Sequence, residues 1–197
     1  MTTFMKSKKG PMVKVFTKNL ANIVTLTRIA LVPLIMYFFY SRHPWASWCA
    51  FFFFFLACLT DYFDGIIARK FKQQSRFGEF LDPIADKILV ISCFIMLAGF
   101  GDFKTATLIP VTLITAREIL ISGLREFLSP LGVCIKVSLF AKWKTFSQML
   151  AIGAFLLGDA SHLIGILTLG EFLIWIAAIL SLLTAADYLK KSKEHLF

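Results

Sequence analysis

Histidine and cysteine are scarce in this chain, with three and four residues among 197. The cysteines lie in or beside apolar stretches, without the spacing of metal ligands, at Cys49, Cys58, Cys93 and Cys134. We therefore expect buried thiols and no disulfide framework. No arrangement of serine, histidine or cysteine indicates a covalent enzyme intermediate.

Acidic residues are also few, with 12 Asp and Glu against 21 Lys and Arg, giving a formal net charge of +9. In a soluble protein this charge would indicate a nucleic-acid partner. However, 58% of the residues are hydrophobic and the mean hydropathy is +0.76, which is too apolar for a soluble domain. No linker or repeat divides the chain. We expect one integral membrane domain and no nucleic-acid partner.

Apolar stretches long enough for helices recur along the chain. There are six, at about 23–40, 45–67, 84–100, 105–124, 145–158 and 163–187. They predict an all-α bundle of six transmembrane helices with both termini on one side. With the N-terminus inside, only Arg42 and Lys104 of the 21 Lys and Arg fall outside, so the positive-inside rule makes both termini cytoplasmic. Lys87 counts here as a cytoplasmic charge, and the histidines fall outside or in the tail.

The first 18 residues are basic and lack a small-residue cleavage site. We interpret residues 1–18 as an uncleaved cytoplasmic juxtamembrane arm, either lying on anionic headgroups or forming a disordered tail. Residues 19–197 then form a single transmembrane domain. The phenylalanine run at 51–55 is interpreted as lipid-facing bulk.

Four aspartates lie at the junction of the second and third apolar stretches, where carboxylates are expensive unless they have a function. On a helix, Asp61 and Asp64 share a face with Gly65 and Ala68. These small residues would let a bulky ligand approach the backbone, and Arg69 at the edge of that face could reach an anionic group.

The second pair of aspartates, Asp82 and Asp86, are four residues apart and also share a helical face. Asp82 followed by Pro83 is typical of a helix N-cap, but a start near Gly78 with a bend at Pro83 fits equally well. Facing helices would gather four carboxylates, which hard divalent cations neutralise. Mg²⁺ or Mn²⁺ is therefore expected, and two ions about 4 Å apart would suit phosphoryl chemistry.

The complete pattern is Asp61-x-x-Asp64-Gly65-x-x-Ala68-Arg69, eight residues, then Gly78-x-x-x-Asp82-x-x-x-Asp86. It resembles the signature of the CDP-alcohol phosphotransferase family, integral membrane enzymes of phospholipid synthesis, with all eight fixed positions present. The resemblance implies that the four aspartates bind metal and that Asp86 is also the general base. It implies room for the nucleotide at Gly65 and Ala68, and a phosphate contact at Arg69.

Residues on either side of the aspartates extend this resemblance. Asn22, Thr25 and Arg28 match the family's PNxLTxxR stretch, with Ala21 where proline is common, and this implies contact with the CDP-diacylglycerol headgroup. Asn22 is alternatively the N-cap of the first helix. Ser75 and Gly78 resemble nucleotide-contacting positions.

Two arginines end the fourth apolar stretch, and each is followed by a glutamate. Arg117 and Arg125 are eight residues apart, so on a helix they point within about 80° of each other. Either each arginine pairs with a glutamate, or the arginines form a cationic pocket for a phosphomonoester with Lys142 or Lys144. The stretch resembles the REI…LRE segment of phosphatidylglycerophosphate synthases, one branch of the family. AKWKT at 141–145 resembles their GKxKT, with Ala141 replacing glycine.

The resemblance implies transfer of a phosphatidyl group from CDP-diacylglycerol to glycerol 3-phosphate, giving phosphatidylglycerophosphate and CMP. It also implies a homodimer. A bacterial inner membrane is expected, and the positive-inside rule places the active site on its cytoplasmic side. Another acceptor, such as inositol phosphate, serine or phosphatidylglycerol, stays open. A divalent-cation transporter is less favoured, because the predicted outer half holds few ionisable residues.

Overall fold

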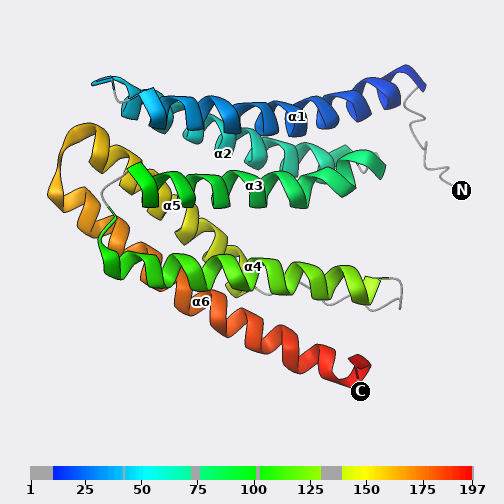
Figure 1. The fold of residues 1–197 in the computed structure, drawn as a ribbon. Helices are drawn as coiled ribbons and strands as arrows, with labels where there is room; N and C mark the ends of the chain where they lie inside the picture. Colours follow the sequence, from blue (N-terminus) through cyan, green and yellow to red (C-terminus); the bar gives the residue numbers. More distant parts are fainter. Residues whose placement is uncertain (1–10, 42, 72–75, 101–102, 130–138, 197) are drawn as a thin grey trace, which may run out of the picture.

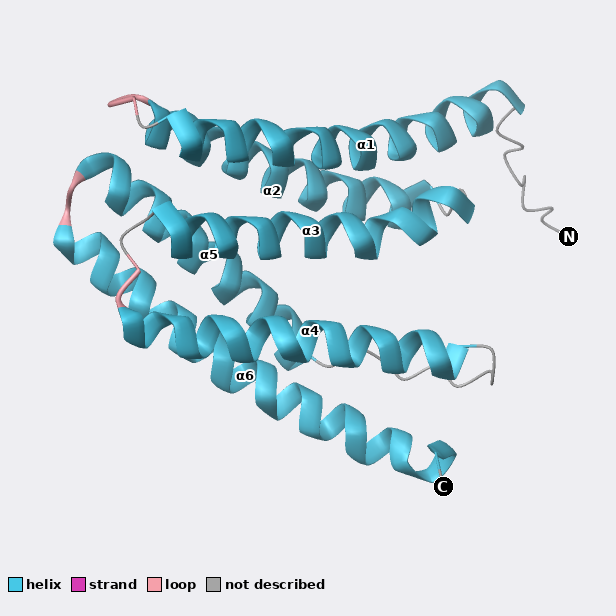
Figure 2. Ribbon diagram, in the orientation of Figure 1, coloured by secondary structure: helices cyan, strands magenta, loops and turns pink. Residues whose placement is uncertain are grey.

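The computed structural model describes residues 11–41, 43–71, 76–100, 103–129 and 139–196, with side chains described outside positions 11–24, 61–80, 82–83, 139 and 194–196. Within these residues the chain is helical, with short turns and no strand (Figure 2). The helices are α1 (Pro11–Ser41), α2 (Ala46–Phe71), α3 (Arg76–Phe100), the short 3-10 helix η1 (Thr105–Thr107), α4 (Leu108–Leu128), α5 (Leu139–Ser161) and α6 (Ile164–Leu196). To within one residue, each of the six predicted stretches lies in one α-helix, or in η1 and α4 together, which confirms the all-α prediction for the described residues.

Two of the candidate helix starts are wrong, because both helices begin earlier than their apolar stretches. Asn22 lies inside α1, which starts at Pro11. No glycine or second proline stands between Pro11 and Asn22, and proline itself is well tolerated at a helix start. Asp82 is likewise not an N-cap, since α3 starts at Arg76 and runs through Pro83. The alternative of a start near Gly78 is the correct one.

Two described segments are long and apolar enough to cross a membrane. They are Thr105–Leu128, with mean hydropathy 1.5, and Ile164–Lys193, with mean hydropathy 2.3. Shorter apolar segments cover Thr25–Ser41 of α1 and Ala46–Thr60 of α2. Many large apolar side chains on the helices point outward, as expected for a protein whose surroundings are apolar.

Successive helices run in opposite directions, so the start of α1 and the end of α6 lie at the same end of the bundle (Figure 1). Helix α1 packs against α2 and α3, while α5 packs against α6 and α2, and α4 packs against α6. Helix α3 touches α4 and α5 at few places. This loose side of α3 is where the cavity described below opens.

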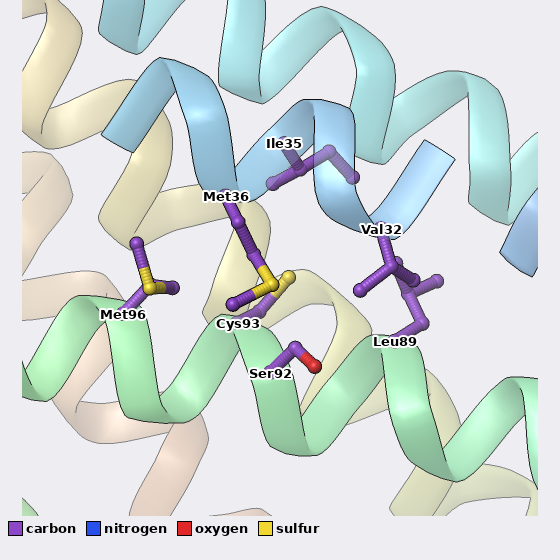
Figure 3. A pocket seen from close by; sticks show the side chains of 7 residues that line it. All are labelled: Val32, Ile35, Met36, Leu89, Ser92, Cys93 and Met96. Atoms are coloured by element: carbon purple, nitrogen blue, oxygen red, sulfur yellow. The ribbon is translucent and has the colours of Figure 1, made fainter. Parts of the chain in front are cut away.

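The packing of α1 on α3 is close (Figure 3). The side chains that meet there are Val32, Ile35 and Met36 from α1 and Leu89, Ser92, Cys93 and Met96 from α3. The crevice between them has no room for a ligand. Phe54 of the phenylalanine run is buried in the adjoining core, whereas Phe52 is exposed, so interpreting the whole run as lipid-facing is wrong. A helix surface has several faces, and only some of the five rings can point outward.

The hairpin of α5 and α6 depends on a glycine. A Cβ at Gly158 would lie 2.6 Å from Cδ2 of Leu167 and 3.2 Å from its backbone nitrogen. We expect Gly158→Ala to lower the free energy of unfolding by about 1–3 kcal/mol, because the two helices must move apart. Gly165→Ala in the same hairpin is the control, since nothing lies within 4 Å of its Cβ position. Thermal unfolding in detergent compares the two variants; equal melting temperatures would contradict the prediction.

Candidate active site

A cavity of about 1480 Å³ lies among α2, α3, α4, α5 and the first half of α6. It is larger than the roughly 300–1,000 Å³ typical of pockets for small molecules. One end is charged and is lined by Asp86, Lys87, Arg117, Glu118, Arg125, Lys142 and Lys144. The other end is apolar and is lined by residues such as Phe51, Phe55, Leu157 and Leu169. A ligand with a charged head and a long apolar part suits this lining.

Asp86 is the one signature aspartate whose side chain is described, and it faces this cavity. Its carboxylate Oδ1 accepts a hydrogen bond from Nη1 of Arg28, and the two groups form an ion pair between α3 and α1. The Arg28 side chain is 2% exposed, whereas the Asp86 side chain is 45% exposed. The buried guanidinium therefore holds one edge of a carboxylate that remains accessible from the cavity. Thr25, one turn before Arg28, is also buried.

The other signature positions are placed by their backbones alone. Asp61, Asp64, Gly65, Ala68 and Arg69 lie in the last part of α2. Gly78 and Asp82 lie in the first turns of α3, and Asn22 lies in α1. Their side chains are outside the described set, and Ser75 is outside the described residues. Helix α2 ends at Phe71 and α3 begins at Arg76, so the two acidic segments lie at the same end of the bundle.

Arg117 and Lys144 share one carboxylate on the wall of the cavity. Oε1 of Glu118 accepts from Nη1 of Arg117 at 3.1 Å and from Nζ of Lys144. Arg117 also donates to α6, through Nε to the Ser181 carbonyl oxygen at 3.1 Å and through Nη2 to Oγ1 of Thr184 at 2.8 Å. All three guanidinium nitrogens of Arg117 thus donate to protein groups. The two hydrogen bonds to Ser181 and Thr184 fix α4 against α6. The first alternative from sequence, an arginine paired with a glutamate, holds for Arg117.

Lys144 precedes the apolar stretch of α5, and its side chain is 7% exposed. Burial lowers the pKa of its ammonium from the usual value, while the carboxylate of Glu118 opposes this shift. The carboxylate of Glu118 thus offsets part of the cost of burying this ammonium beside the cavity.

Arg125 and Lys142 are the exposed cations of the charged end. The guanidinium carbon of Arg125 lies 5.9 Å from the ring centroid of Tyr188 on α6, within the range of a cation–π contact. Neither residue has an ion pair among the described side chains. Of the four predicted acceptor cations, these two are the more available to a ligand, although all four line the same cavity.

Sequence reasoning missed the site role of Glu118 as a bridge between α4 and α5, and it gave Lys87 no role at the site. Lys87 lines the cavity and donates a hydrogen bond to the Ser122 hydroxyl across from α3 to α4. The sequence signal for a role at the site was the position of Lys87 directly after Asp86. The positive-inside rule already accounted for a lysine there, so this signal was overlooked.

The donor set of the signature fits Mg²⁺ or Mn²⁺, since carboxylate oxygens are the ligands that these ions prefer. The accessible carboxylate of Asp86 agrees with such a role. Among the described side chains no three His, Cys, Asp or Glu residues gather around one point, but three of the four signature aspartates are outside that set.

Comparisons with known proteins identify the family of this chain. A family model described as CDP-alcohol phosphatidyltransferase matches residues 18–183. A relative from Rickettsia bellii (strain RML369-C), named CDP-diacylglycerol–glycerol-3-phosphate 3-phosphatidyltransferase, is 45% identical over 90% of this chain and 97% of its own. Relatives with the same name from Cereibacter sphaeroides and Haemophilus influenzae are each 38% identical over 90% of this chain, covering 97% and 95% of their own. The chain belongs to the CDP-alcohol phosphatidyltransferase family.

Proposed function

We propose that the protein transfers a phosphatidyl group from CDP-diacylglycerol to glycerol 3-phosphate, giving phosphatidylglycerophosphate and CMP. The names of its relatives support this reaction. The observation that carries it is the cavity, because an accessible carboxylate and several cations occupy one end while the other end is apolar. A phosphorylated acceptor and a nucleotide headgroup would use the charged end, and acyl chains would use the apolar end.

In this proposal Asp61, Asp64, Asp82 and Asp86 hold Mg²⁺ or Mn²⁺, with two ions as the expected number. Such ions supply charge neutralisation at the pyrophosphate and at the departing CMP. The nucleotide and its phosphates lie against Asn22, Thr25, Gly65, Ala68, Arg69, Ser75 and Gly78.

Asp86 acts as the general base of the reaction. Its carboxylate takes the proton from the acceptor hydroxyl as that oxygen bonds to the phosphorus carrying the diacylglycerol. The bond from this phosphorus to the CMP oxygen breaks, and CMP leaves. Because the acceptor oxygen attacks the phosphorus directly, no covalent enzyme intermediate is formed. Arg28 holds Oδ1 of Asp86, which supports a fixed direction for the carboxylate toward the cavity.

The acceptor phosphate is bound by the cations of α4 and α5. Arg125 and Lys142 supply exposed donors, while Lys144 and Arg117 supply charge from the wall, where Glu118 fixes them. A dianionic phosphate suits this set better than a neutral alcohol does. Because Arg117 is also held by Ser181 and Thr184, its position would persist when the ligand leaves.

We also propose that all six α-helices span a bacterial inner membrane, with cytoplasmic termini and the charged end of the cavity facing the cytoplasm. The exposed Trp143 near that end and the exposed Trp45 and Tyr40 near the opposite end are placed as interfacial aromatic residues are. A homodimer and bound membrane lipid complete the proposal by family resemblance.

The proposal predicts that purified protein in detergent releases CMP from CDP-diacylglycerol when Mg²⁺ and glycerol 3-phosphate are present. Inositol phosphate, inositol, serine and phosphatidylglycerol are offered separately as controls, and we expect none of them to support release. Release with another acceptor would keep the reaction class and contradict the proposed acceptor. No release with any acceptor, from folded protein supplied with Mg²⁺, would overturn the enzyme assignment.

A further inference from the structure

Lys87 occupies an unusual position, next to the proposed base and directed across the cavity. It follows Asp86 on α3, and both residues line the cavity. Its ammonium donates a hydrogen bond to the hydroxyl of Ser122 on α4. Helices α3 and α4 touch at few other places, and both Lys87 and Ser122 line the cavity. This hydrogen bond therefore connects the two helices at the charged end of the cavity.

The hydrogen bond to Ser122 places the ammonium among the acceptor cations. Ser122 follows Glu118 by four residues and precedes Arg125 by three, so the three side chains are neighbours on one side of α4. All three line the cavity together with Lys87. The charge of Lys87 therefore lies beside the phosphate pocket proposed above, although it comes from the helix that carries the base.

The partners of the cavity cations differ in charge. Arg117 and Lys144 share the carboxylate of Glu118, whereas the hydrogen bond of Lys87 goes to a neutral hydroxyl. A hydrogen bond to a phosphate oxygen is charge-assisted and stronger than one to a hydroxyl. A phosphate at the charged end would therefore displace Ser122 from Lys87 more readily than it would displace Glu118 from Lys144.

We propose that Lys87 binds the phosphate of the acceptor and exchanges Ser122 for it when the acceptor enters. This inference rests on the proposed function and extends its acceptor site to α3. The Cα atoms of Asp86 and Lys87 are about 3.8 Å apart, and a short carbon chain separates the reacting hydroxyl of glycerol 3-phosphate from its phosphate. One turn of α3 would thus hold both ends of the acceptor, the hydroxyl at Asp86 and the phosphate at Lys87.

Lys87→Met tests the proposal by removing the charge while keeping most of the length of the side chain. We expect its KM for glycerol 3-phosphate to rise about tenfold or more, with the KM for CDP-diacylglycerol changed less than about twofold. Lys87→Arg should recover most of the loss because it keeps a cation. A rise confined to the KM for CDP-diacylglycerol would overturn the proposal and assign Lys87 to the donor pyrophosphate.

Ser122→Ala separates binding from a purely structural tie between α3 and α4. If Lys87 only ties the helices together, removing its hydroxyl partner should raise the KM for glycerol 3-phosphate as much as Lys87→Met does, and that result would overturn the proposal. We expect Ser122→Ala to leave this KM unraised. A wild-type protein inactive with glycerol 3-phosphate would refute the proposed function. An active wild type with an unchanged KM in Lys87→Met would refute this inference alone.

A measurement on the unaltered protein avoids any loss of folding in the variants. Lysine acetylation followed by mass spectrometry reports the accessibility of Lys87, with the exposed Lys104 at the opposite end of the bundle as the internal control. We expect glycerol 3-phosphate to slow labelling of Lys87 and not of Lys104. Equal labelling of Lys87 with and without saturating glycerol 3-phosphate would contradict the proposal.

Discussion

Replacing Asp86 with asparagine is expected to lower the rate of CMP release by about 10²–10⁴-fold, the usual contribution of a positioned general base. The amide cannot take the proton of the acceptor hydroxyl, and it removes one of the four proposed metal-binding carboxylates. Asparagine has nearly the same shape and still offers an oxygen to Arg28, so we expect the fold to persist. The measurement is CMP release with CDP-diacylglycerol and glycerol 3-phosphate, beside thermal unfolding in detergent.

Asp187→Asn is the matched control for this substitution. The carboxylate of Asp187 is exposed on α6 and forms an ion pair with Lys191, one turn later, at 2.8 Å. An exposed pair of this kind contributes about 0.3–0.5 kcal/mol, so neither activity nor stability should change measurably. A folded Asp86→Asn variant that works as fast as Asp187→Asn would rule out a catalytic role for Asp86.

The positions of the helices were predictable because each contains a long apolar stretch that can be read from the sequence. Their starts were not, since polar residues can continue a helix beyond its apolar stretch, and α3 does so even though Gly78 and Pro83 lie within it. Asn22 and Asp82 both belong to residue types that favour N-caps, yet each lies inside a longer helix. Capping preference is a weak signal beside an uninterrupted helical segment.

Spacing along one helix predicted which side chains could share a face. Arg117 and Arg125 are the predicted pair whose two side chains are both described, and both line the cavity. Spacing could not predict partners on different helices. Lys144 meets Glu118 from a helix 26 positions away, and Lys87 meets Ser122 from 35 positions away, so only the packing of the bundle brings them together.

Arg28 shows the same limit, because its sequence neighbourhood resembled a headgroup-binding stretch while its side chain contacts the proposed base. Its partner Asp86 is 58 positions away on α3. A buried guanidinium could in principle serve both groups, holding the carboxylate at rest and meeting a phosphate nearby. The two roles predict different kinetic changes, and a substitution at Arg28 distinguishes them.

Arg28→Met is expected to lower kcat by about 10²-fold, because a small misplacement of a catalytic group costs that much. Methionine fills much of the buried volume without charge, and the carboxylate left behind is 45% exposed to the cavity, so the fold should tolerate the change. Arg28→Lys keeps the charge but loses the planar guanidinium, and we expect it to recover only part of the rate. Steady-state kinetics with CDP-diacylglycerol varied at saturating glycerol 3-phosphate provide the test.

The control removes an ion pair far from the cavity. Lys104 and Glu171 form an exposed pair at 2.9 Å near the start of α4, and Lys104→Met should leave kcat unchanged and cost less than about 1 kcal/mol of stability.

If Arg28 positions Asp86, its loss lowers kcat while the KM for CDP-diacylglycerol changes less than about twofold. An increased KM for CDP-diacylglycerol with an unchanged kcat would contradict positioning and assign Arg28 to the headgroup, as the sequence resemblance implies. Since the guanidinium is buried against α3 and Asp86 is open to the cavity, we expect the first result.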